Sequence, residues 1–389
     1  MKTIDLVYFN AGGGHRAAAL ALQDVVREQR RPWNIRLVNL FEVLDRKGAF
    51  RRLTGSAPED LYNKRLARGW TLGLAQELKL LQAMIRLCHT TLRRALQEHW
   101  LRTEPDLVVS LVPNFNRALC ESVAATLPGV PFVTVLTDMA DHPPHFWIEP
   151  GQRQHLVCGT PKAVAQARAA GYANSQISLT SGMILRPAFY RPSDIDRDAV
   201  RRSLGLDPTL PTGVVMFGGQ GSMQMASIAK SLSDVQLILL CGHNEALVAK
   251  LRGQAPTAPH MVVRYTPEVS SYMRLGDFLI GKPGPGSLSE AIQSGLPVIT
   301  CSNAWTMPQE RYNAQWVREQ GIGIVLTSLR TIRSGVTEMV LRLPELRDQV
   351  SRIDNRAVFE VPEILNDLMH KASIPTRLPR DLAGIRVLS

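Results

Sequence analysis

The sequence lacks the cysteine spacing of a disulfide-bonded or zinc-binding domain. Its five cysteines are odd in number, widely separated and never arranged as CxxC. This pattern indicates neither a disulfide framework nor a structural zinc site, and it fits a reducing compartment best. No apolar run approaches the ~20 residues that span a bilayer. Residues 1–5 lead directly into an apolar segment, so no signal peptide is expected and we predict a cytoplasmic protein.

Aromatic residues are also scarce, at 6% of the chain, and acidic residues are outnumbered by basic ones. The 45 Lys and Arg exceed the 34 Asp and Glu by 11, which favours acidic partners such as nucleic acid, anionic lipid or a phosphorylated substrate. Nucleic-acid binding would need stacking aromatics among the basic residues, so we do not expect it. The P-loop, HExxH and GxSxG motifs are absent, which leaves the common nucleotide-hydrolase, zinc-protease and serine-hydrolase sites without support.

What the chain does contain is a regular alternation of short apolar runs and helical stretches. Continuous apolar strands separated by helices predict parallel sheets that are covered on both faces. A Pro-rich stretch at 182–194 divides the series in two and is typical of an interdomain linker. We expect strands at 4–9, 35–40, 107–111, 132–136, 214–217, 236–240, 261–265, 278–280 and 298–301.

This pattern predicts an α/β protein of two doubly wound domains, and 389 residues are enough for both. Ligands bind beyond the carboxyl ends of the strands in such domains, so two facing domains form a cleft. We place the N-terminal domain at 1–185 and the C-terminal domain at 186–355. Residues 356–389 are expected to form a helix and tail that pack back on the N-terminal domain.

A basic segment, residues 46–102, differs from the rest of the chain. It holds 12 Lys and Arg against four Asp and Glu, with Trp70 and several leucines interleaved at roughly helical spacing. A basic amphipathic helix of this kind suits an anionic membrane surface. A long helix whose apolar side packs on the sheet and whose basic side is solvated explains the pattern equally well.

A glycine-rich turn, Gly12–Gly14, follows the first predicted strand and precedes a predicted helix at 18–27. Glycines let a ligand approach the backbone, and a helix start offers free N–H groups. The positive helix end should keep His15 neutral near pH 7 and able to accept a proton; a histidine that only caps the turn is the alternative. The loose match to a dinucleotide-binding motif lacks its acid, because Asn39 stands where the second strand ends.

A second polar cluster, Thr137–Trp147, follows the fourth predicted strand and contains Asp138, Asp141, His142 and His145. Carboxylates and imidazoles at the carboxyl end of a strand can move protons, so Asp138 is a second candidate for proton transfer. The alternative is that Asp138 only caps the next turn. The spacing of these groups matches no zinc pattern.

The second half repeats this arrangement. Gly218–Ser222 and Gly281–Glu290 each join a predicted strand to a helix, where backbone N–H groups can hold phosphate. We expect Glu290 at the first turn of its helix, where its carboxylate reaches ribose hydroxyls. Residues 309–313 then supply hydrogen-bonding side chains that suit the hydroxyls of a sugar. The two glycine-rich segments, Glu290 and residues 309–313, in this order along the chain, together predict a nucleotide-sugar site.

Taken in order, these motifs resemble those of the monogalactosyldiacylglycerol synthases, with bacterial diacylglycerol glucosyltransferases and MurG as more distant relatives. The resemblance implies a GT-B fold of two Rossmann-like domains facing a central cleft. It also implies a UDP-sugar donor on the C-terminal domain, a lipid acceptor on the N-terminal domain, and no essential metal or other cofactor. The motifs are GGGHRA at 12–17, VLTD at 135–138, GGQG at 218–221, KPGPGSLSEA at 282–291 and QE at 309–310.

The resemblance implies roles for individual residues. His15 and Asp138 would lie at the acceptor, where either is the base, and Asp138 alternatively orients His15. The basic segment 46–102 corresponds to the membrane-associating region of the family. The donor would be held by Gly218, Gly219, Gln220, Gly221, Ser222, Gly286, Ser287, Glu290, Gln309, Glu310 and Asn313, with Met261–Thr266 beside the uracil, and the acceptor side would include Gly13, Gly14 and His142.

Two departures from the family pattern fall at this site. The spacing from Asp138 to His142 is one residue shorter than in the plant enzymes, which leaves the role of His142 open. Residues 304–308 replace the small residues expected before the Gln-Glu pair, which leaves the identity of the sugar open.

The resulting prediction is an inverting transferase that moves a hexose from a UDP-sugar to a lipid hydroxyl, with diacylglycerol as the expected acceptor, at the inner face of the cell membrane. Helix N-termini would stabilise the leaving diphosphate in place of a metal ion. Two alternatives are a UDP-sugar 2-epimerase on the same fold and a non-catalytic module that recruits partners to anionic membranes.

Overall fold

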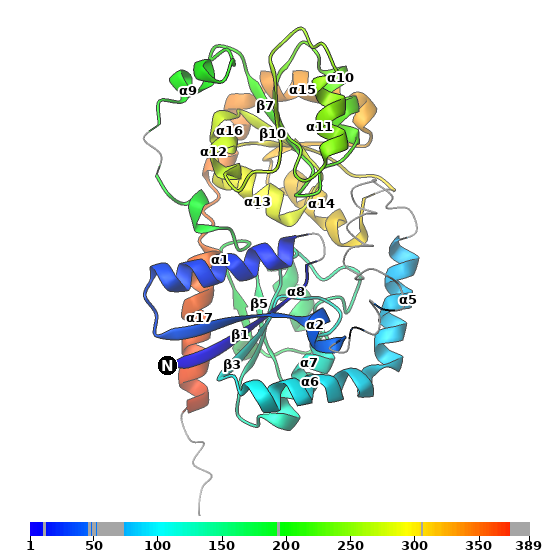
Figure 1. The fold of residues 1–389 in the computed structure, drawn as a ribbon, viewed down its shortest axis with the longest axis vertical. Coiled ribbons are helices and arrows are strands. Elements are labelled where there is room, and N and C mark those ends of the chain that lie inside the picture. Colours follow the sequence, from blue (N-terminus) through cyan, green and yellow to red (C-terminus); the bar gives the residue numbers. More distant parts are fainter. Residues whose placement is uncertain are drawn as a thin grey trace, which may run out of the picture.

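The computed structural model describes residues 1–10, 13–45, 48, 52, 74–192, 195–304 and 306–373. Two six-stranded sheets lie one above the other along the long axis of the molecule (Figure 1). Every strand pairing within both sheets is parallel, and helices separate the strands along the chain. The predicted α/β class and the pair of doubly wound units are confirmed.

The first sheet has the strand order β2-β1-β3-β4-β5-β6. Its central strands β3 and β4 are buried along their whole length, because helices cover both faces and only apolar or small side chains fit between them. The strands are β1 (Lys2–Tyr8), β2 (Trp33–Asn39), β3 (Leu107–Ser110), β4 (Phe132–Val135), β5 (His155–Cys158) and β6 (Ile177–Leu179).

The second sheet has the order β12-β11-β10-β7-β8-β9, so β7, the first strand of this half, lies inside the sheet beside β10. The chain order therefore reverses at β7 and β10, and the crevice outside the carboxyl ends of such strands is where open α/β sheets bind ligands. The strands are β7 (Thr212–Met216), β8 (Gln236–Leu240), β9 (His260–Val263), β10 (Phe278–Gly281), β11 (Val298–Cys301) and β12 (Gly323–Leu326).

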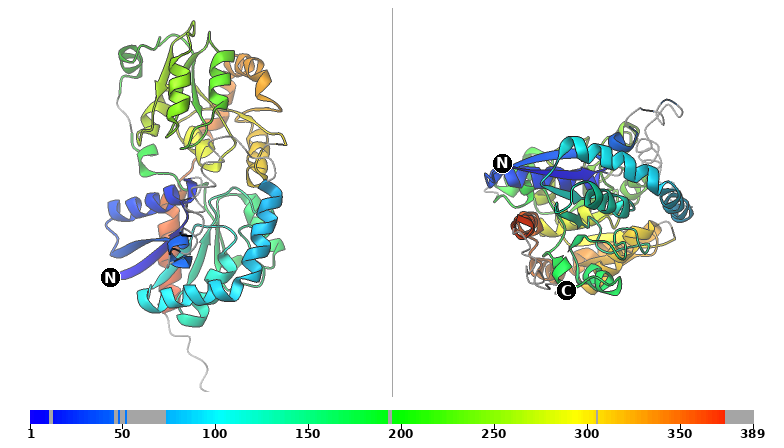
Figure 2. Two further views of the ribbon diagram at one scale, coloured as in Figure 1. Left: turned by 45° about the vertical axis from the view of Figure 1, so that its right-hand side comes forward. Right: turned by 90° about the horizontal axis from the view of Figure 1, so that it is seen from below.

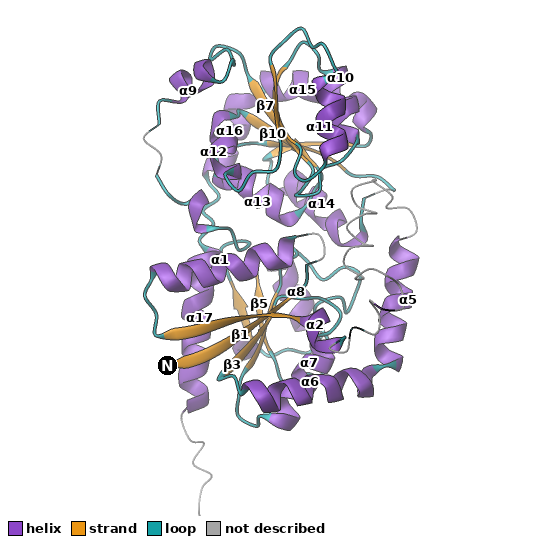
Figure 3. Cartoon of the chain, in the orientation of Figure 1, coloured by secondary structure: helices purple, strands orange, loops and turns teal. Residues whose placement is uncertain are grey.

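The helices lie on both faces of each sheet (Figure 3). In the N-terminal half they are α1 (Gly14–Glu28), α2 (Leu40–Leu44), α5 (Leu74–Leu87), α6 (His89–Thr103), α7 (Asn116–Thr126) and α8 (Pro161–Ala169). In the C-terminal half they are α9 (Arg197–Ser203), α10 (Gln224–Ser231), α11 (Glu245–Arg252), α12 (Val269–Leu275), α13 (Pro285–Gln293), α14 (Arg311–Glu319), α15 (Ile332–Leu341) and α16 (Leu343–Ser351). The helix α17 (Ala357–Ser373) follows them along the chain.

All nine predicted strands are present, and three further strands, β5, β6 and β12, were not predicted. Each of the three has only three or four residues, and His155 and Ser178 interrupt the apolar runs of β5 and β6. The helix predicted at 18–27 begins four residues earlier, at Gly14, directly after the glycine turn. The three strands that were missed are all short; β6 and β12 lie at sheet edges, whereas β5 lies between β4 and β6.

The last helix, α17, returns to the N-terminal sheet. Its residues Val361, Leu365 and Met369 are buried in one apolar cluster with Ile4 and Leu6 of β1. Figure 1 shows α17 beside the first sheet, although the residues that precede it belong to the other half of the molecule. Residues 374–389 of the predicted tail lie outside the described residues.

The two chain segments that connect the halves are hydrogen-bonded to each other. Asn355 Nδ2 donates to the Met183 carbonyl at 2.9 Å, and the Arg356 N–H donates to Ser181 Oγ at 2.7 Å. Gly182 has no room for a side chain, since a Cβ there would lie 2.7 Å from Asn355 Cγ. Both connections therefore cross at one point, which we call the hinge.

The basic segment lies mainly outside the described residues up to position 73, and its described part forms α5 and α6. Figure 2 shows α5 at one side of the N-terminal half. On α5 the side chains of Leu80, Met84 and Leu87 are 62%, 48% and 86% exposed. Its opposite side packs inward through Leu78, as expected for a helix that packs on the sheet, while contact with a membrane stays a prediction.

Candidate active site

The loop after β4 carries the predicted cluster and is organised by Asp141. The Asp141 carboxylate accepts hydrogen bonds from the backbone N–H groups of His145, Trp147 and Ile148 at 3.0, 2.6 and 3.4 Å. Its own backbone N–H and carbonyl are bonded to the Gln166 side chain. Asp141 is therefore a structural residue that fixes where the Trp147 side chain lies.

Asp138 is buried and accepts a 2.9 Å hydrogen bond from the Trp147 indole Nε1. Burial raises the pKa of Asp138 to about 7, although the indole hydrogen bond opposes the rise. Two charged groups of the C-terminal half also act on it: the Glu310 carboxylate raises this pKa and the Lys282 ammonium lowers it. A carboxyl group that titrates near neutral pH is suited to accepting a proton.

His15, the second residue of α1, lies near the same indole. The ring centroids of His15 and Trp147 are 5.9 Å apart, and His15 Nδ1 is 3.0 Å from Thr137 Oγ1. Burial lowers the pKa of His15 to about 4, and a backbone hydrogen bond with Leu111 opposes the shift only partly. The lowered pKa leaves the ring neutral at pH 7, as the sequence predicted, and burial is the main cause of the shift.

Trp147 thus links the two predicted proton-transfer residues, while Thr137 is the hydrogen-bonding partner of His15. The alternative in which Asp138 orients His15 directly has no hydrogen bond to support it among the contacts of the described residues.

A charged pair of the C-terminal half faces this loop. Lys282 Nζ lies 2.7 Å from Glu310 Oε1, and the Glu310 side chain is buried. A Cβ at Gly218 would lie 3.7 Å from Lys282 Cε, and one at Gly284 would lie 3.4 Å from it. The lysine therefore sits where both glycine-rich loops of the C-terminal half converge.

The first of these loops, Gly218–Ser222, is held by backbone contacts. Gly218 and Gly221 have positive φ angles of 77° and 60°, which favour glycine. A Cβ at Gly221 would lie only 2.3 Å from the Cys241 carbonyl oxygen, and His243 N–H donates to the Gly219 carbonyl at 3.0 Å. Gly219 is exposed, so its backbone is accessible to a ligand.

The second loop leads into α13, which starts at Pro285 after the N-cap Gly284. Gly284 has no side chain to cap the helix, and Gly286 is exposed, so the first-turn N–H groups are available to an anion. The expectation that Glu290 lies in the first turn is wrong. Proline favours the first helical position and starts α13 at residue 285, which puts Glu290, the sixth residue, in the second turn. Burial raises its pKa to about 7.

The other predicted donor residues differ in their surroundings. Gln309 is partly buried near Met307, and Ser222 Oγ accepts from the Gln224 N–H at 3.3 Å. Asn313 is fully buried, and its Nδ2 donates to the Pro283 carbonyl at 2.8 Å, so it holds the second loop. Gln220 is partly exposed.

On the acceptor side, Gly13 and Gly14 are exposed at the start of α1, and the N-cap Gly13 has a φ of 85°. His142 is partly buried in the loop after β4, where burial lowers its pKa. Gly12 and Trp305, which the predictions also used, lie outside the described residues.

The sequence reasoning assigned no role to Trp147 or Lys282, although both stood in the motifs that it quoted. Their partners are 9 and 28 residues away along the chain. The signal that could have found Lys282 is its place at a strand end directly before a glycine-rich helix start. Within the described ranges, no group of three His, Cys, Asp or Glu side chains could hold a metal ion. In the same part of the chain, no helix is long and apolar enough to cross a bilayer.

Comparison with known proteins bears on the family and the fold of the chain. Residues 214–367 match the glycosyltransferase family 28 C-terminal domain. The chain is 27% identical to the probable monogalactosyldiacylglycerol synthase 2, chloroplastic, of Oryza sativa subsp. japonica, over 98% of this chain and 84% of that protein. It is 24% identical to monogalactosyldiacylglycerol synthase 1, chloroplastic, of Arabidopsis thaliana, over 95% and 72%. The crystal structure of Acinetobacter baumannii MurG matches with a TM-score of 0.60 at 12% identity, covering 94% of this chain and 100% of that one.

The paired parallel sheets and the family 28 domain define a GT-B glycosyltransferase. Within that class, the chain resembles the monogalactosyldiacylglycerol synthases over nearly its whole length, which confirms the resemblance predicted from its motifs.

Proposed function

We propose that this protein transfers a hexose, with inversion, from a UDP-sugar to the hydroxyl of diacylglycerol at a membrane surface. The observation that carries the proposal is the position of Asp138. This carboxyl group of the N-terminal half is buried and lies within electrostatic reach of Lys282 and Glu310, which stand between the two glycine-rich loops of the other half.

In the proposed mechanism, Asp138 removes the proton from the acceptor hydroxyl as the oxygen attacks the anomeric carbon. The UDP oxygen leaves from the opposite side of that carbon, so the configuration inverts. The N–H groups at the start of α13, the Gly218–Ser222 backbone and the Lys282 ammonium stabilise the negative charge that develops on the diphosphate. No divalent ion is needed for these steps. Neutral His15 and Trp147 would position the hydroxyl.

The test of the proposed function is a product assay. Purified protein is incubated with each radiolabelled UDP-hexose and with diacylglycerol vesicles, and the lipids are resolved by chromatography. A labelled β-configured glycolipid from an α-configured donor supports the proposal. A UDP-sugar epimerised without lipid would instead identify a 2-epimerase, and liposome binding without UDP binding would identify a recruitment module.

The pH dependence of transfer distinguishes the two candidate bases. Asp138 accepts a proton only as the carboxylate, and its pKa is raised to about 7 by burial. We therefore expect kcat/KM for the acceptor to rise with pH and to reach half its maximum near pH 7. If His15 were the base, its pKa of about 4 would leave the rate flat from weakly acidic to neutral pH. Initial rates measured across this range, at saturating donor, decide between them.

Replacing Lys282, which lies where the two glycine-rich loops converge, should lower kcat/KM for the UDP-sugar. In a Lys282→Met variant, the charge-assisted contact to the diphosphate disappears; such hydrogen bonds contribute about 1.5–3 kcal/mol. We expect kcat/KM for the UDP-sugar to fall about ten- to a hundredfold, since 1.4 kcal/mol is about tenfold. Steady-state kinetics at varied donor concentration measure the change.

Two further variants control this experiment. Lys230 lies exposed on α10 of the same half, so Lys230→Met removes the same charge without touching the loops and should leave the kinetics unchanged. The Lys282→Met, Glu310→Gln double variant also removes the carboxylate that the single variant leaves buried without its partner. Because Glu310 is itself an expected donor residue, the donor kinetics of the double variant should be no better than those of Lys282→Met. Donor kinetics of Lys282→Met equal to those of the unaltered protein would contradict the role of this lysine.

Contact with the membrane is assigned to α5. Its exposed Leu80, Met84 and Leu87 supply apolar area, and Lys79 and Arg86 on the same helix supply positive charge. Interfacial helices combine these two features. Binding to anionic vesicles that weakens in a Leu80→Ser, Leu87→Ser variant would support this assignment.

A further inference from the structure

Trp147 is fixed in place through its backbone as well as through its ring. Its N–H donates to Asp141 Oδ1 at 2.6 Å, and its carbonyl accepts from Asn116 Nδ2 at 3.0 Å. Asn116 belongs to α7 and is itself held by Ser110 Oγ of β3, which donates to its Oδ1 at 2.6 Å. The Trp147 side chain is fully buried in an apolar cluster. The indole therefore cannot turn away without breaking contacts to two other parts of the N-terminal half.

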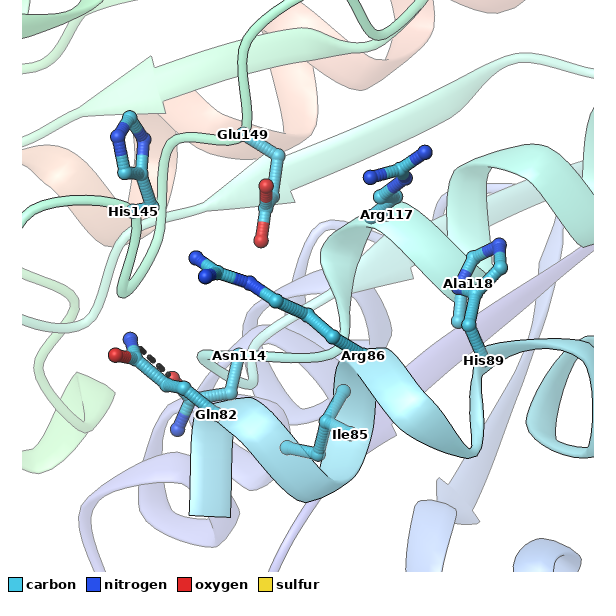
Figure 4. A pocket seen from close by; sticks show the side chains of 9 residues that line it. All are labelled: Gln82, Ile85, Arg86, His89, Asn114, Arg117, Ala118, His145 and Glu149. Carbon is cyan, nitrogen blue, oxygen red and sulfur yellow. Dashed lines mark hydrogen bonds between the residues drawn. The ribbon is translucent and has the colours of Figure 1, made fainter. Parts of the chain in front are cut away.

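The loop around Trp147 directs its other polar side chains elsewhere. His145 and Glu149 line a polar pocket of about 120 Å³ beside α5, and Trp147, which lies between them in the sequence, does not line it (Figure 4). The indole Nε1 donates instead to Asp138 Oδ2 at 2.9 Å. The polar atom of this ring is therefore directed at the candidate base.

The two carboxylate oxygens of Asp138 differ in their surroundings. Oδ2 accepts the hydrogen bond from the indole. Oδ1 accepts none from the residues that the structure describes, and it is not among the unpartnered atoms of these residues that are closed off from solvent. Each oxygen of an ionised carboxylate can accept hydrogen bonds, so Oδ1 is the oxygen that can receive one from a hydroxyl group.

We propose that Trp147 is a positioning residue, which holds Oδ2 of Asp138 and thereby presents Oδ1 to the acceptor hydroxyl. The inference rests on the proposed function, in which Asp138 is the base. In that reaction the O–H bond of the acceptor breaks and its proton goes to Oδ1, while the acceptor oxygen bonds to the anomeric carbon and the UDP oxygen leaves with its bonding electrons. Trp147 exchanges no proton and acts through Asp138.

Other groups also act on Asp138. Burial is the main cause of its raised pKa, which Glu310 and Asp141 raise further and Lys282 lowers. From α1, neutral His15 adds no charge at pH 7. A variant that replaces only the indole keeps all of these groups. Because the indole N–H stabilises the carboxylate, its removal should raise the pKa of Asp138.

The first experiment detects the contact without any substrate. In the full chain with ¹⁵N-labelled indoles, each of the six tryptophans gives one Nε1–H NMR signal, and Trp147→Phe identifies the signal of Trp147. We expect this signal to shift with pH with a midpoint near 7, and Asp138→Asn to abolish the shift. The Trp100 signal is the internal control, because its Nε1 donates at 2.8 Å to Ser122 Oγ, a hydroxyl that keeps its proton in this range.

The second experiment compares the pH profiles of transfer in Trp147→Phe and Trp100→Phe. Both indoles are fully buried and each donates one hydrogen bond, so the two variants lose similar packing. In Trp147→Phe, we expect the midpoint of kcat/KM for the acceptor to rise by about one pH unit. The rate above the midpoint should fall about ten- to a hundredfold, because the base is no longer held in position. Trp100→Phe should keep the midpoint and the rate.

A Trp147 signal that does not shift with pH, or that still shifts in Asp138→Asn, would overturn the proposal. So would a Trp147→Phe profile equal to that of the unaltered protein. The same change in Trp100→Phe would also overturn it, since the effect would then be one of packing alone. The NMR titration uses neither donor nor acceptor, so absence of transfer by the unaltered protein would count against the proposed function and not against the contact.

Discussion

Replacing Asp138 by asparagine is expected to lower the rate of hexosyl transfer by about 10²- to 10⁴-fold, the usual contribution of a general base. Asparagine has the size of aspartate and can still accept the hydrogen bond from Trp147 Nε1, so the loop after β4 keeps its shape. It cannot take a proton from the acceptor hydroxyl. Single-turnover rates with saturating donor and acceptor measure the loss.

UDP affinity provides the control for this variant. The donor loops belong to the other half of the molecule, so calorimetry should give the same dissociation constant for the variant and the unaltered protein. The pH dependence with a midpoint near 7 should also disappear from the residual rate. A variant that transfers hexose at the normal rate would show that Asp138 is not the base.

Replacing Asp277 by asparagine is expected to destabilise the fold by about 3–5 kcal/mol, the usual cost of leaving a buried charge unpaired. Asp277 precedes β10, and its carboxylate accepts hydrogen bonds from Arg197, Arg201 and Arg347 at 2.7, 2.6 and 2.5 Å. It also accepts one from the Thr212 N–H at 2.7 Å. The Arg201 side chain is only 2% exposed, so water cannot replace the lost partner. Urea denaturation measures the difference.

Asp234→Asn is the matched control, because its ion pair with Arg333 at 2.8 Å is about half exposed on both sides. Exposed pairs contribute about 0–1 kcal/mol, so this variant should unfold nearly as the unaltered protein does. Equal unfolding midpoints for the two variants would contradict the role given to Asp277. The Asp277 carboxylate lies at the amino end of β10, away from the site, so the folded variant should remain active.

The pH dependence of the unfolding free energy should also show the contribution of Asp277. Its arginine partners, acting against burial, lower the pKa of Asp277 to about 2 from an ordinary value of 3.8. Because the folded-state pKa is the lower one, the stabilisation is fully present above about pH 4 and is lost as pH falls toward 2. Unfolding free energies measured over this range should fall more steeply for the unaltered protein than for Asp277→Asn.

The fold could be predicted from the sequence because buried parallel strands require continuous apolar runs. Runs such as 107–111 and 236–240 are of the kind that such strands need, and both form strands that are buried along their whole length. Strand β6 was not predicted because it lies at the sheet edge, where Leu179 is 54% exposed. A partly exposed strand of three residues does not require a continuous apolar run.

The site was only partly predictable for a related reason. Glycine-rich turns at strand ends mark places where a backbone can meet a ligand, and such local features are visible in a sequence. The bond from Trp147 to Asp138 and the pair of Lys282 with Glu310 depend on how loops fold and how two halves meet. No local pattern encodes these contacts, and the neutral state of His15 likewise comes from surroundings that the chain acquires only on folding.

The hinge has a consequence for dissecting the molecule. Because the chain passes between the halves twice, a fragment ending at 185 would lack α17 and expose Ile4, Leu6 and Val25 to water, where Val358, Val361 and Leu365 now cover them. The excised piece should aggregate unless the terminal helix is supplied. Fusing residues 356–373 behind such a fragment through a flexible connector should restore a monomeric, crystallisable half, and adding the helix as a separate peptide should rescue it by complementation.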